Sequence, residues 1–442
     1  MDNDFPHFPD GDVLILITSS RRYKLHSSIL RRSSPTFAAL LDEQTATVLS
    51  KNARKKGVTT RFRLHLVDYE NAGYREGGVE APTHVLRRIP LDENGSAVGD
   101  YPDLLGDAIE NGRVVQQFVL AWEQVLGALY NRTIDIGDNE RDGIDYILES
   151  AGTILTAAEC LNSPTIVTRP IEASLLSLSQ VLHRSIASNP TPWLDFSFRL
   201  RSKTLWKESL IHGAGRFNSP QIQSALASHD LHPSIVEVLT KKAQLLKTLS
   251  QRTQSNLLSY YPEALQRTKT VGRADRDSIG RASYANDIMQ WVALSVWRHW
   301  LAQQVSADNT HHAADMGFEF FRLISRAGEA YLDRNQLRQF HDYFPMSLKG
   351  ESVVENRVSE LKAEGQGMVR KVLENHSYLD VEKFPAGHMT CTWVGPEDYP
   401  WETQSGAGAA GDGRSARGTA EPSEFGGSWG GEEAQSVLGS QA

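Results

Sequence analysis

Short apolar runs alternate with polar stretches in the N-terminal part of the chain and predict a small sheet. Residues 12–18 (DVLILIT) are an apolar run of strand length, which is typical of a buried strand. Residues 21–26 are suited to pair with that strand as a hairpin. Residues 60–69 alternate apolar and polar side chains, so they predict a half-buried strand with His65 on its polar face. Residues 85–91 predict a further strand.

Two short helices are predicted directly after the hairpin. Residues 26–34 predict the first of them. The pair Ser34 and Pro35 predicts the start of the second, because serine is favoured at the N-cap and proline at the first helical position. Phe37 and Leu40 are spaced to share one apolar face of that helix. These helices are expected to cover the sheet.

The rest of the apolar pattern is helical. Residues 114–130 carry a wide apolar stripe at helical spacing, and residues 143–182 predict two or three short helices. Further helices are predicted at 190–217, 233–261, 286–305, 316–332 and 352–375. The glycines of EGQGM at 364–368 predict a kink or an end of the last one.

Together these patterns predict an α+β domain followed by an all-α region. The predicted parts are a flexible leader at 1–10, an α+β domain at 11–182 with a strand-containing insertion at 44–112, an all-helical domain at 183–394 and a disordered tail at 395–442. The tail is rich in Gly, Ser, Ala and Glu, so it lacks the apolar surface that offsets the entropy of ordering a chain.

Composition narrows the functional class. The net charge of −8 argues against direct nucleic-acid binding, which normally needs a basic face. With 2 cysteines, no disulfide framework is expected, as in proteins of a reducing compartment. The N-terminus lacks the features of a signal peptide, and the apolar runs are too short to span a membrane. We therefore expect a cytoplasmic and/or nuclear location.

Three blocks of the N-terminal region resemble a BTB/POZ domain in their order and spacing. The first strand and the two helices after it carry Asp12, Val13, Leu14, Leu16, Leu25, His26, Leu30, Ser34 and Phe37. The later blocks carry Leu129, Tyr130, Ile134, Leu155, Ala158, Leu161 and Val167. The resemblance spans about residues 11–180, and the long insertion is similar to those of BTB proteins of filamentous fungi.

The resemblance implies a protein-interaction function. The residues of its structural signature are Asp12, His26, Leu30, Ser34, Phe37 and Tyr130. An apolar surface for self-association or partner recruitment would be formed by Val13, Leu14, Leu16, Phe37 and Leu40. The implied partners are a second copy of the chain or another protein, including a cullin if the chain is a substrate adaptor of a ubiquitin ligase.

One departure from the family pattern leaves an alternative open. In many BTB domains a basic residue follows the corner histidine and pairs with the acid of the first strand, but here Ser27 follows His26. Asp12 is therefore either solvated or part of a rearranged pocket, because a buried unpaired charge is costly. The alternative function is a transcriptional or scaffold regulator that acts through partners without direct DNA binding.

Catalytic, cofactor and metal sites are not expected. His388 and Cys391 are close in sequence, but a zinc site needs about four ligands and no second pair has suitable spacing. An enzyme would be favoured if His212, His299 or His311 converged with carboxylates in a pocket. The tryptophans 291, 297 and 300 are helix-spaced and suit either a partner groove or, as we favour, core packing.

Overall fold

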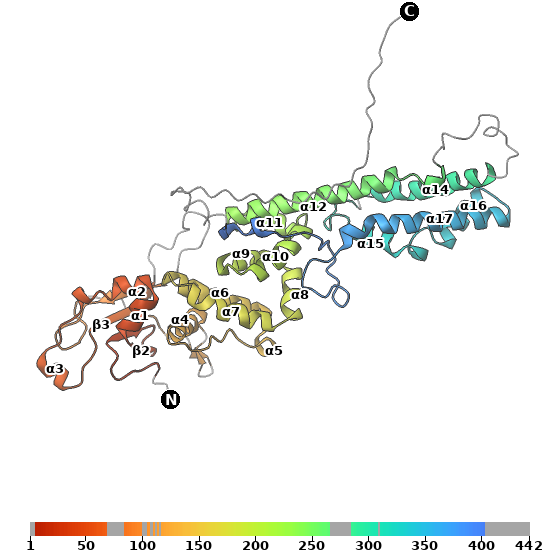
Figure 1. Cartoon of the computed structure of the whole chain (residues 1–442). Coiled ribbons are helices and arrows are strands. Elements are labelled where there is room, and N and C mark those ends of the chain that lie inside the picture. Colours follow the sequence, from red (N-terminus) through yellow and green to blue (C-terminus); the bar gives the residue numbers. More distant parts are fainter. Residues whose placement is uncertain are drawn as a thin grey trace, which may run out of the picture.

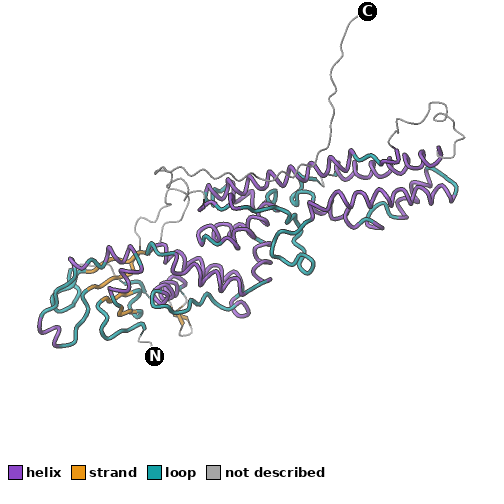
Figure 2. Tube along the Cα trace, in the orientation of Figure 1, coloured by secondary structure: helices purple, strands orange, loops and turns teal. Residues whose placement is uncertain are grey.

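A computed structural model describes residues 5–68, 84–99, 104–106, 109–110, 113–114, 116–265, 284–307 and 310–402. The molecule is elongated, with the sheet at one end and a helical bundle at the other (Figure 1). Strands are confined to the N-terminal end, and helices joined by loops form the rest of the coloured tube (Figure 2). The predicted order, a small sheet followed by a mostly helical region, is confirmed.

The sheet of the described residues has the order β2-β1-β3-β4. The four strands are β1 (Val13–Leu16), β2 (Arg22–Leu25), β3 (Phe62–Asp68) and β4 (His84–Ile89). β1 pairs antiparallel with β2 as predicted, and parallel with β3, which pairs antiparallel with β4. Because β3 lies between β1 and β4, the segment predicted as an insertion supplies half of this sheet.

β3 differs from the prediction in the burial of its polar face. His65 was expected to lie on a solvated face, but it is fully buried. Its side chain accepts a hydrogen bond from Nε of Arg63 at 2.8 Å. Burial and the nearby Arg63 charge lower the pKa of His65 to about 4, so the ring is held neutral. Both faces of the strand are therefore covered.

The sheet and the helices that follow it share one continuous core. They are α1 (Ser27–Ser33), α2 (Pro35–Leu40), α4 (Gln117–Ala128), α6 (Ile144–Cys160), α7 (Thr165–Ser177), α8 (Gln180–Ser188) and α9 (Pro190–Leu200). Short elements lie between them: α3 (Lys51–Lys55), β5 (Ile109–Glu110), β6 (Arg113–Val114) and α5 (Asn139–Asp142). Leu182, Trp193 and Leu205 belong to the same core as β1. The boundary predicted at 182/183 therefore does not coincide with a break in packing.

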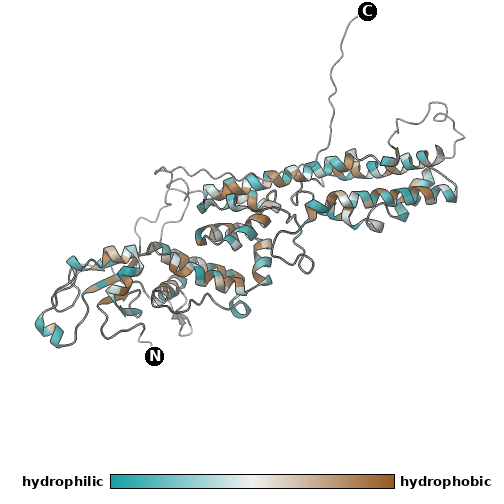
Figure 3. Cartoon of the chain, viewed as in Figure 1, coloured by the Kyte–Doolittle hydropathy of each residue, from teal (hydrophilic) through white to brown (hydrophobic). Residues whose placement is uncertain are grey.

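The second half of the chain is built from longer helices. They are α10 (Lys203–Gly215), α11 (Pro220–Ala227), α12 (Pro233–Ser259), α14 (Tyr284–Ser306), α15 (Phe318–Arg326), α16 (Arg334–Tyr343) and α17 (Leu348–Val369). Hydrophobic and hydrophilic residues alternate around these helices (Figure 3). The predicted break at 364–368 is absent, because α17 continues to Val369. Gly365 serves packing instead: a Cβ at this position would lie 3.2 Å from the side chain of Trp297, so glycine allows α17 to approach that ring closely.

Both predicted flexible ends contain packed residues. In the leader, the ring of Phe8 stacks on Tyr130 with 5.0 Å between centroids. After residue 395, Nε1 of Trp206 donates to the carbonyl of Asp398 at 2.8 Å, and Nζ of Lys242 lies 2.5 Å from the Asp398 carboxylate. The predicted tail thus starts too early, since these contacts bury Asp398 almost completely. Its remainder, residues 403–442, lies outside the described residues.

Candidate functional site

The corner between β2 and α1 is held by the histidine that the sequence singled out. The backbone N–H of His26 donates to Oη of Tyr130 at 2.8 Å, and its ring Nδ1 lies 3.2 Å from the same oxygen. The other ring nitrogen lies 3.1 Å from Oδ1 of Asp10. Both ring nitrogens have partners within the chain, so this histidine acts as a structural corner.

Asp12 has two donors in place of the basic residue that the sequence lacks. Its carboxylate accepts from the backbone N–H of Ser27 at 2.7 Å and from the Ser27 hydroxyl at 2.6 Å. Hydrogen bonds to a charged group are among the strongest in proteins. Of the two alternatives, the structure therefore supports a rearranged pocket. Ser27, which stands where the family has a basic residue, supplies the hydrogen bonds to the Asp12 carboxylate.

The predicted helix start at Ser34 is confirmed. Its hydroxyl accepts from the backbone N–H of Phe37 at 3.1 Å and donates to the carbonyl of Leu161 at 2.6 Å. Leu30 and Phe37 are fully buried in the core. These side chains fix α2 against the end of α6, which is a role in stability.

The predicted apolar interface is wrong in most of its members. Val13, Leu16 and Phe37 are buried inside the core, with exposed fractions of 0%, 2% and 0%. Leu14 and Leu40 are half-buried. A side chain that already packs inside the chain cannot contribute to a surface, so these five residues do not form a docking face.

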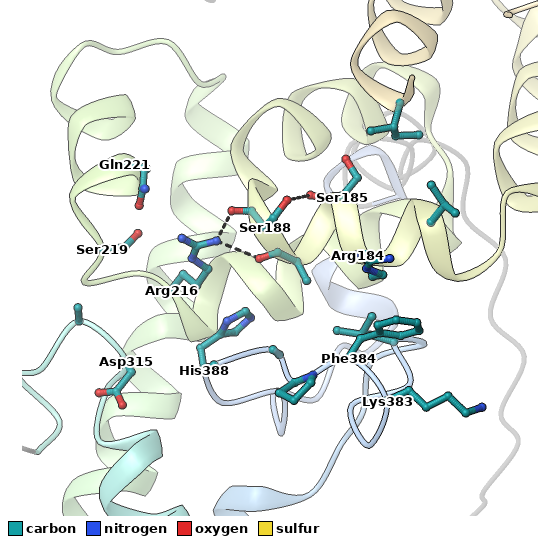
Figure 4. Close-up of a pocket in the computed structure, with 18 of the residues that line it drawn as sticks. Arg184, Ser185, Ser188, Arg216, Ser219, Gln221, Asp315, Lys383, Phe384 and His388 are labelled. Carbon is teal, nitrogen blue, oxygen red and sulfur yellow. Dashed lines mark hydrogen bonds between the residues drawn. The ribbon is translucent and has the colours of Figure 1, made fainter. Parts of the chain in front are cut away.

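A crevice lies where the two halves of the molecule meet the C-terminal segment. Its volume is about 930 Å³, and it is lined by residues from α6, α8, α11 and the loops at 314–315 and 379–388. Three cationic residues line it: Arg184, Arg216 and Lys383 (Figure 4). The guanidinium of Arg184 lies 4.6 Å from the centre of the Phe384 ring, and Lys383 pairs with Asp380 at 2.9 Å.

A buried polar network stands behind this crevice. Oε1 of Glu208 lies 3.3 Å from Nε2 of His212, whose Nδ1 lies 2.8 Å from Nε2 of His388. Nδ1 of His183 also lies 3.3 Å from Oε1 of Glu208. The backbone N–H of Tyr378 donates to the other carboxylate oxygen, Oε2 of Glu208, at 2.8 Å. Helices α8 and α10 and the C-terminal segment are thereby joined at one carboxylate.

The charges in this network follow from burial. Burial alone would raise the pKa of Glu208, but contacts with His183 and His212 and the amide of Tyr378 lower it to about 2. Burial, with the nearby His212 and Arg216, lowers the pKa of His388 to about 3. The network thus contains an ionised carboxylate that is linked through His212 to a neutral His388.

Sequence reasoning named two members of this network without joining them. His212 was considered for an enzyme site, and it does converge with a carboxylate, but both groups are fully buried. His388 was paired with Cys391, whereas the structure pairs it with His212, 176 residues away. Among the described residues, no group of three or more His, Cys, Asp or Glu side chains is arranged to hold a metal ion.

The far end of the helical bundle exposes a patch of large apolar side chains. We call it the tip patch, and it consists of Phe340, Tyr343, Phe344 and Leu348 at the junction of α16 and α17. The exposed fractions of Tyr343, Phe344 and Leu348 are 89%, 63% and 84%. The rings of Phe340 and Phe344 stack with 6.0 Å between centroids. Sequence reasoning missed this patch because it lies between two predicted helices, although the run FHDYFPMSL signals it.

The helix-spaced tryptophans divide between core and surface. Trp297 and Trp300 are buried, and Trp300 stacks on Tyr331 with 4.2 Å between ring centroids. The exposed fraction of Trp291 is 46%. The favoured prediction, core packing, therefore describes two of the three residues. No helix within the described ranges is long and apolar enough to cross a membrane.

Comparison with known proteins places a family match on this bundle. Residues 262–371 match the model of an FF domain of the fungal type, a protein–protein interaction module. No BTB/POZ model matches, so the resemblance drawn from the N-terminal blocks is wrong, and the self-association and cullin-adaptor functions implied by it lose their basis. Neither a curated protein nor a solved structure matches the chain. The region of this chain with a recognised family resemblance is thus the bundle of α14 to α17.

Proposed function

We propose that the chain is a protein-binding module that contacts a partner through the tip patch. The observation that carries this proposal is the FF-domain match at 262–371, because FF domains are protein–protein interaction modules. The tip patch lies within the matched residues. A partner protein is the ligand class that this family resemblance supports.

The physical properties of the tip patch suit such a contact. Large exposed aromatic side chains supply much of the binding energy at protein interfaces, because they bury a large area at little cost in rotamer entropy. Covering apolar surface is worth about 25 cal/mol per Å². The stacked rings of Phe340 and Phe344 form a pre-arranged platform beside Tyr343. We infer that the partner presents apolar side chains to this platform.

The same proposal treats the chain as a binding protein and not as an enzyme. This part rests on the sequence, in which no catalytic motif was found, and it stays a prediction. The prediction that the chain does not bind nucleic acid directly rests on the net charge of −8 and has the same standing.

The proposal is tested by affinity capture with the full chain and two variants. Tyr343→Ser/Phe344→Ser removes the aromatic part of the tip patch, while Trp393→Ser removes an aromatic side chain that is 70% exposed outside the bundle. The proposal expects a partner that is retained by the wild type and the control but lost with the tip variant. It is rejected if the tip variant retains every protein that the wild type retains.

A further inference from the structure

We propose that the wall of the crevice at the start of α11 binds the phosphate group of a phosphate monoester. Arg216, Ser219 and Gln221 lie together on this wall, with their polar ends pointing toward one another (Figure 4). The site is formed by residues outside the FF-domain match. It is therefore independent of the function proposed for the tip patch.

The start of α11 has donors without an acceptor. Ser219 occupies the N-cap, but its side chain does not cap the helix. Its hydroxyl is buried without a hydrogen-bond partner in the described part of the chain, and the residue as a whole is 6% exposed. Pro220 follows at the first helical position, so the next amides, of Gln221 and Ile222, are the first free N–H groups of the helix. A buried hydroxyl without a partner is costly, and an anion at the helix start would satisfy it.

Arg216 supplies a full positive charge beside this helix start. Nη1 of its guanidinium donates to the carbonyl of Ala187 at 3.0 Å and to that of Ser188. These bonds hold the guanidinium at the crevice. Within the described residues its Nε and Nη2 make no hydrogen bond, so they remain as donors. Arginine binds phosphate well because it offers several N–H groups in a fixed plane.

Two carboxylates, of Asp145 and Asp315, line the crevice together with its cations. The Asp315 oxygens accept from the backbone N–H groups of Gly317 and Glu319 at 3.0 Å and 2.9 Å, so this carboxylate is held by its own loop and is not paired with Arg216. His388 is held neutral by burial. The site therefore combines a guanidinium, a hydroxyl and helix amides on one wall of the crevice. A tetrahedral phosphate can accept from all three, and a planar carboxylate offers fewer acceptor positions.

The test measures binding of inorganic phosphate and of a neutral peptide with one phosphoserine to the full chain by calorimetry. Ser219→Ala removes the buried hydroxyl. Because that hydroxyl has no partner, the variant should fold as well as the wild type, and it should bind phosphate about tenfold more weakly, the effect of losing a hydrogen bond to a charged group. Ser224→Ala is the matched control, since Ser224 is exposed on the same helix. Ser219→Asp places a carboxylate at the N-cap and should abolish binding while raising the melting temperature.

The results distinguish the source of the phosphate. Tighter binding of the phosphopeptide than of inorganic phosphate supports the site and identifies a phosphorylated protein segment as its ligand. Equal binding supports the site and identifies a small phosphorylated molecule. The proposal is overturned if neither probe binds the wild type at about 10 mM, or if Ser224→Ala weakens binding as much as Ser219→Ala.

Discussion

Replacing Glu208 with glutamine tests whether the buried network holds the C-terminal segment in place. Glu208 is fully buried, and its carboxylate contacts His183 on α8, His212 on α10 and the backbone N–H of Tyr378. Glu208→Gln keeps the shape of the side chain and removes its charge. The variant isolates what the ionised carboxylate contributes to folding.

The expected magnitude follows from the pKa of this carboxyl. A pKa that falls from its ordinary value of 4.5 to about 2 on folding corresponds to roughly 3 kcal/mol of stabilisation, because each pKa unit is worth about 1.4 kcal/mol. This contribution is present above pH 4.5 and is lost as the pH falls toward 2, because the acid is then protonated in both states. The variant should therefore unfold about 3 kcal/mol more easily at pH 7, with a smaller difference below pH 4.5.

Urea denaturation followed by tryptophan fluorescence at pH 7 and at pH 3 measures this difference. Hydrogen exchange of the Tyr378 amide reports on the C-terminal segment itself and should speed up in the variant. Glu237→Gln is the matched control, since Glu237 is exposed on α12. A destabilisation at pH 7 that is below about 1 kcal/mol, or one that is equal at both pH values, would refute the account of the network.

Two further predictions concern how the C-terminal segment is attached. Lys242→Met should destabilise the chain by about 3 kcal/mol, because it leaves the Asp398 carboxylate buried without its cation. The double variant Lys242→Met/Asp398→Leu should recover most of the lost stability, as measured by thermal unfolding. Gly215→Ala would place a Cβ 2.1 Å from the carbonyl of Met389, so limited proteolysis should release the C-terminal segment sooner than in the wild type. Gly367→Ala is the control, because a Cβ at this position meets open space. It should stabilise the chain by about 0.5–1 kcal/mol and so raise the melting temperature. Equal rates of proteolysis for the two glycine variants would contradict this reasoning.

Local signals in the sequence predicted the elements better than their partners. The apolar run at 12–18 and the Ser34–Pro35 pair each contain their own structural information, and both predictions were confirmed. The parallel pairing of β1 with β3 depends on contacts far apart in sequence, so the segment of β3 was misjudged as an insertion. The BTB/POZ resemblance failed for a related reason, because short apolar blocks at similar spacing reflect general packing needs.

The sites were harder to predict than the fold. The contact of His212 with His388 joins residues 176 positions apart, and no periodicity marks such a pair. The tip patch was missed because it lies between the helices predicted at 316–332 and 352–375, and the exposure of Tyr343 and Phe344 cannot be read from the apolar pattern. An unpartnered hydroxyl such as that of Ser219 becomes visible only when its surroundings are known.

Site-specific photo-crosslinking is the most direct test of protein binding through the tip patch. A photoreactive phenylalanine analogue would replace Tyr343 in the full chain, and Trp393 in a control of similar exposure outside the bundle. The account predicts a discrete protein adduct from position 343 in cells, which position 393 does not give and which Phe344→Ser reduces. Absence of an adduct at 343, or the same adducts from both positions, would contradict it.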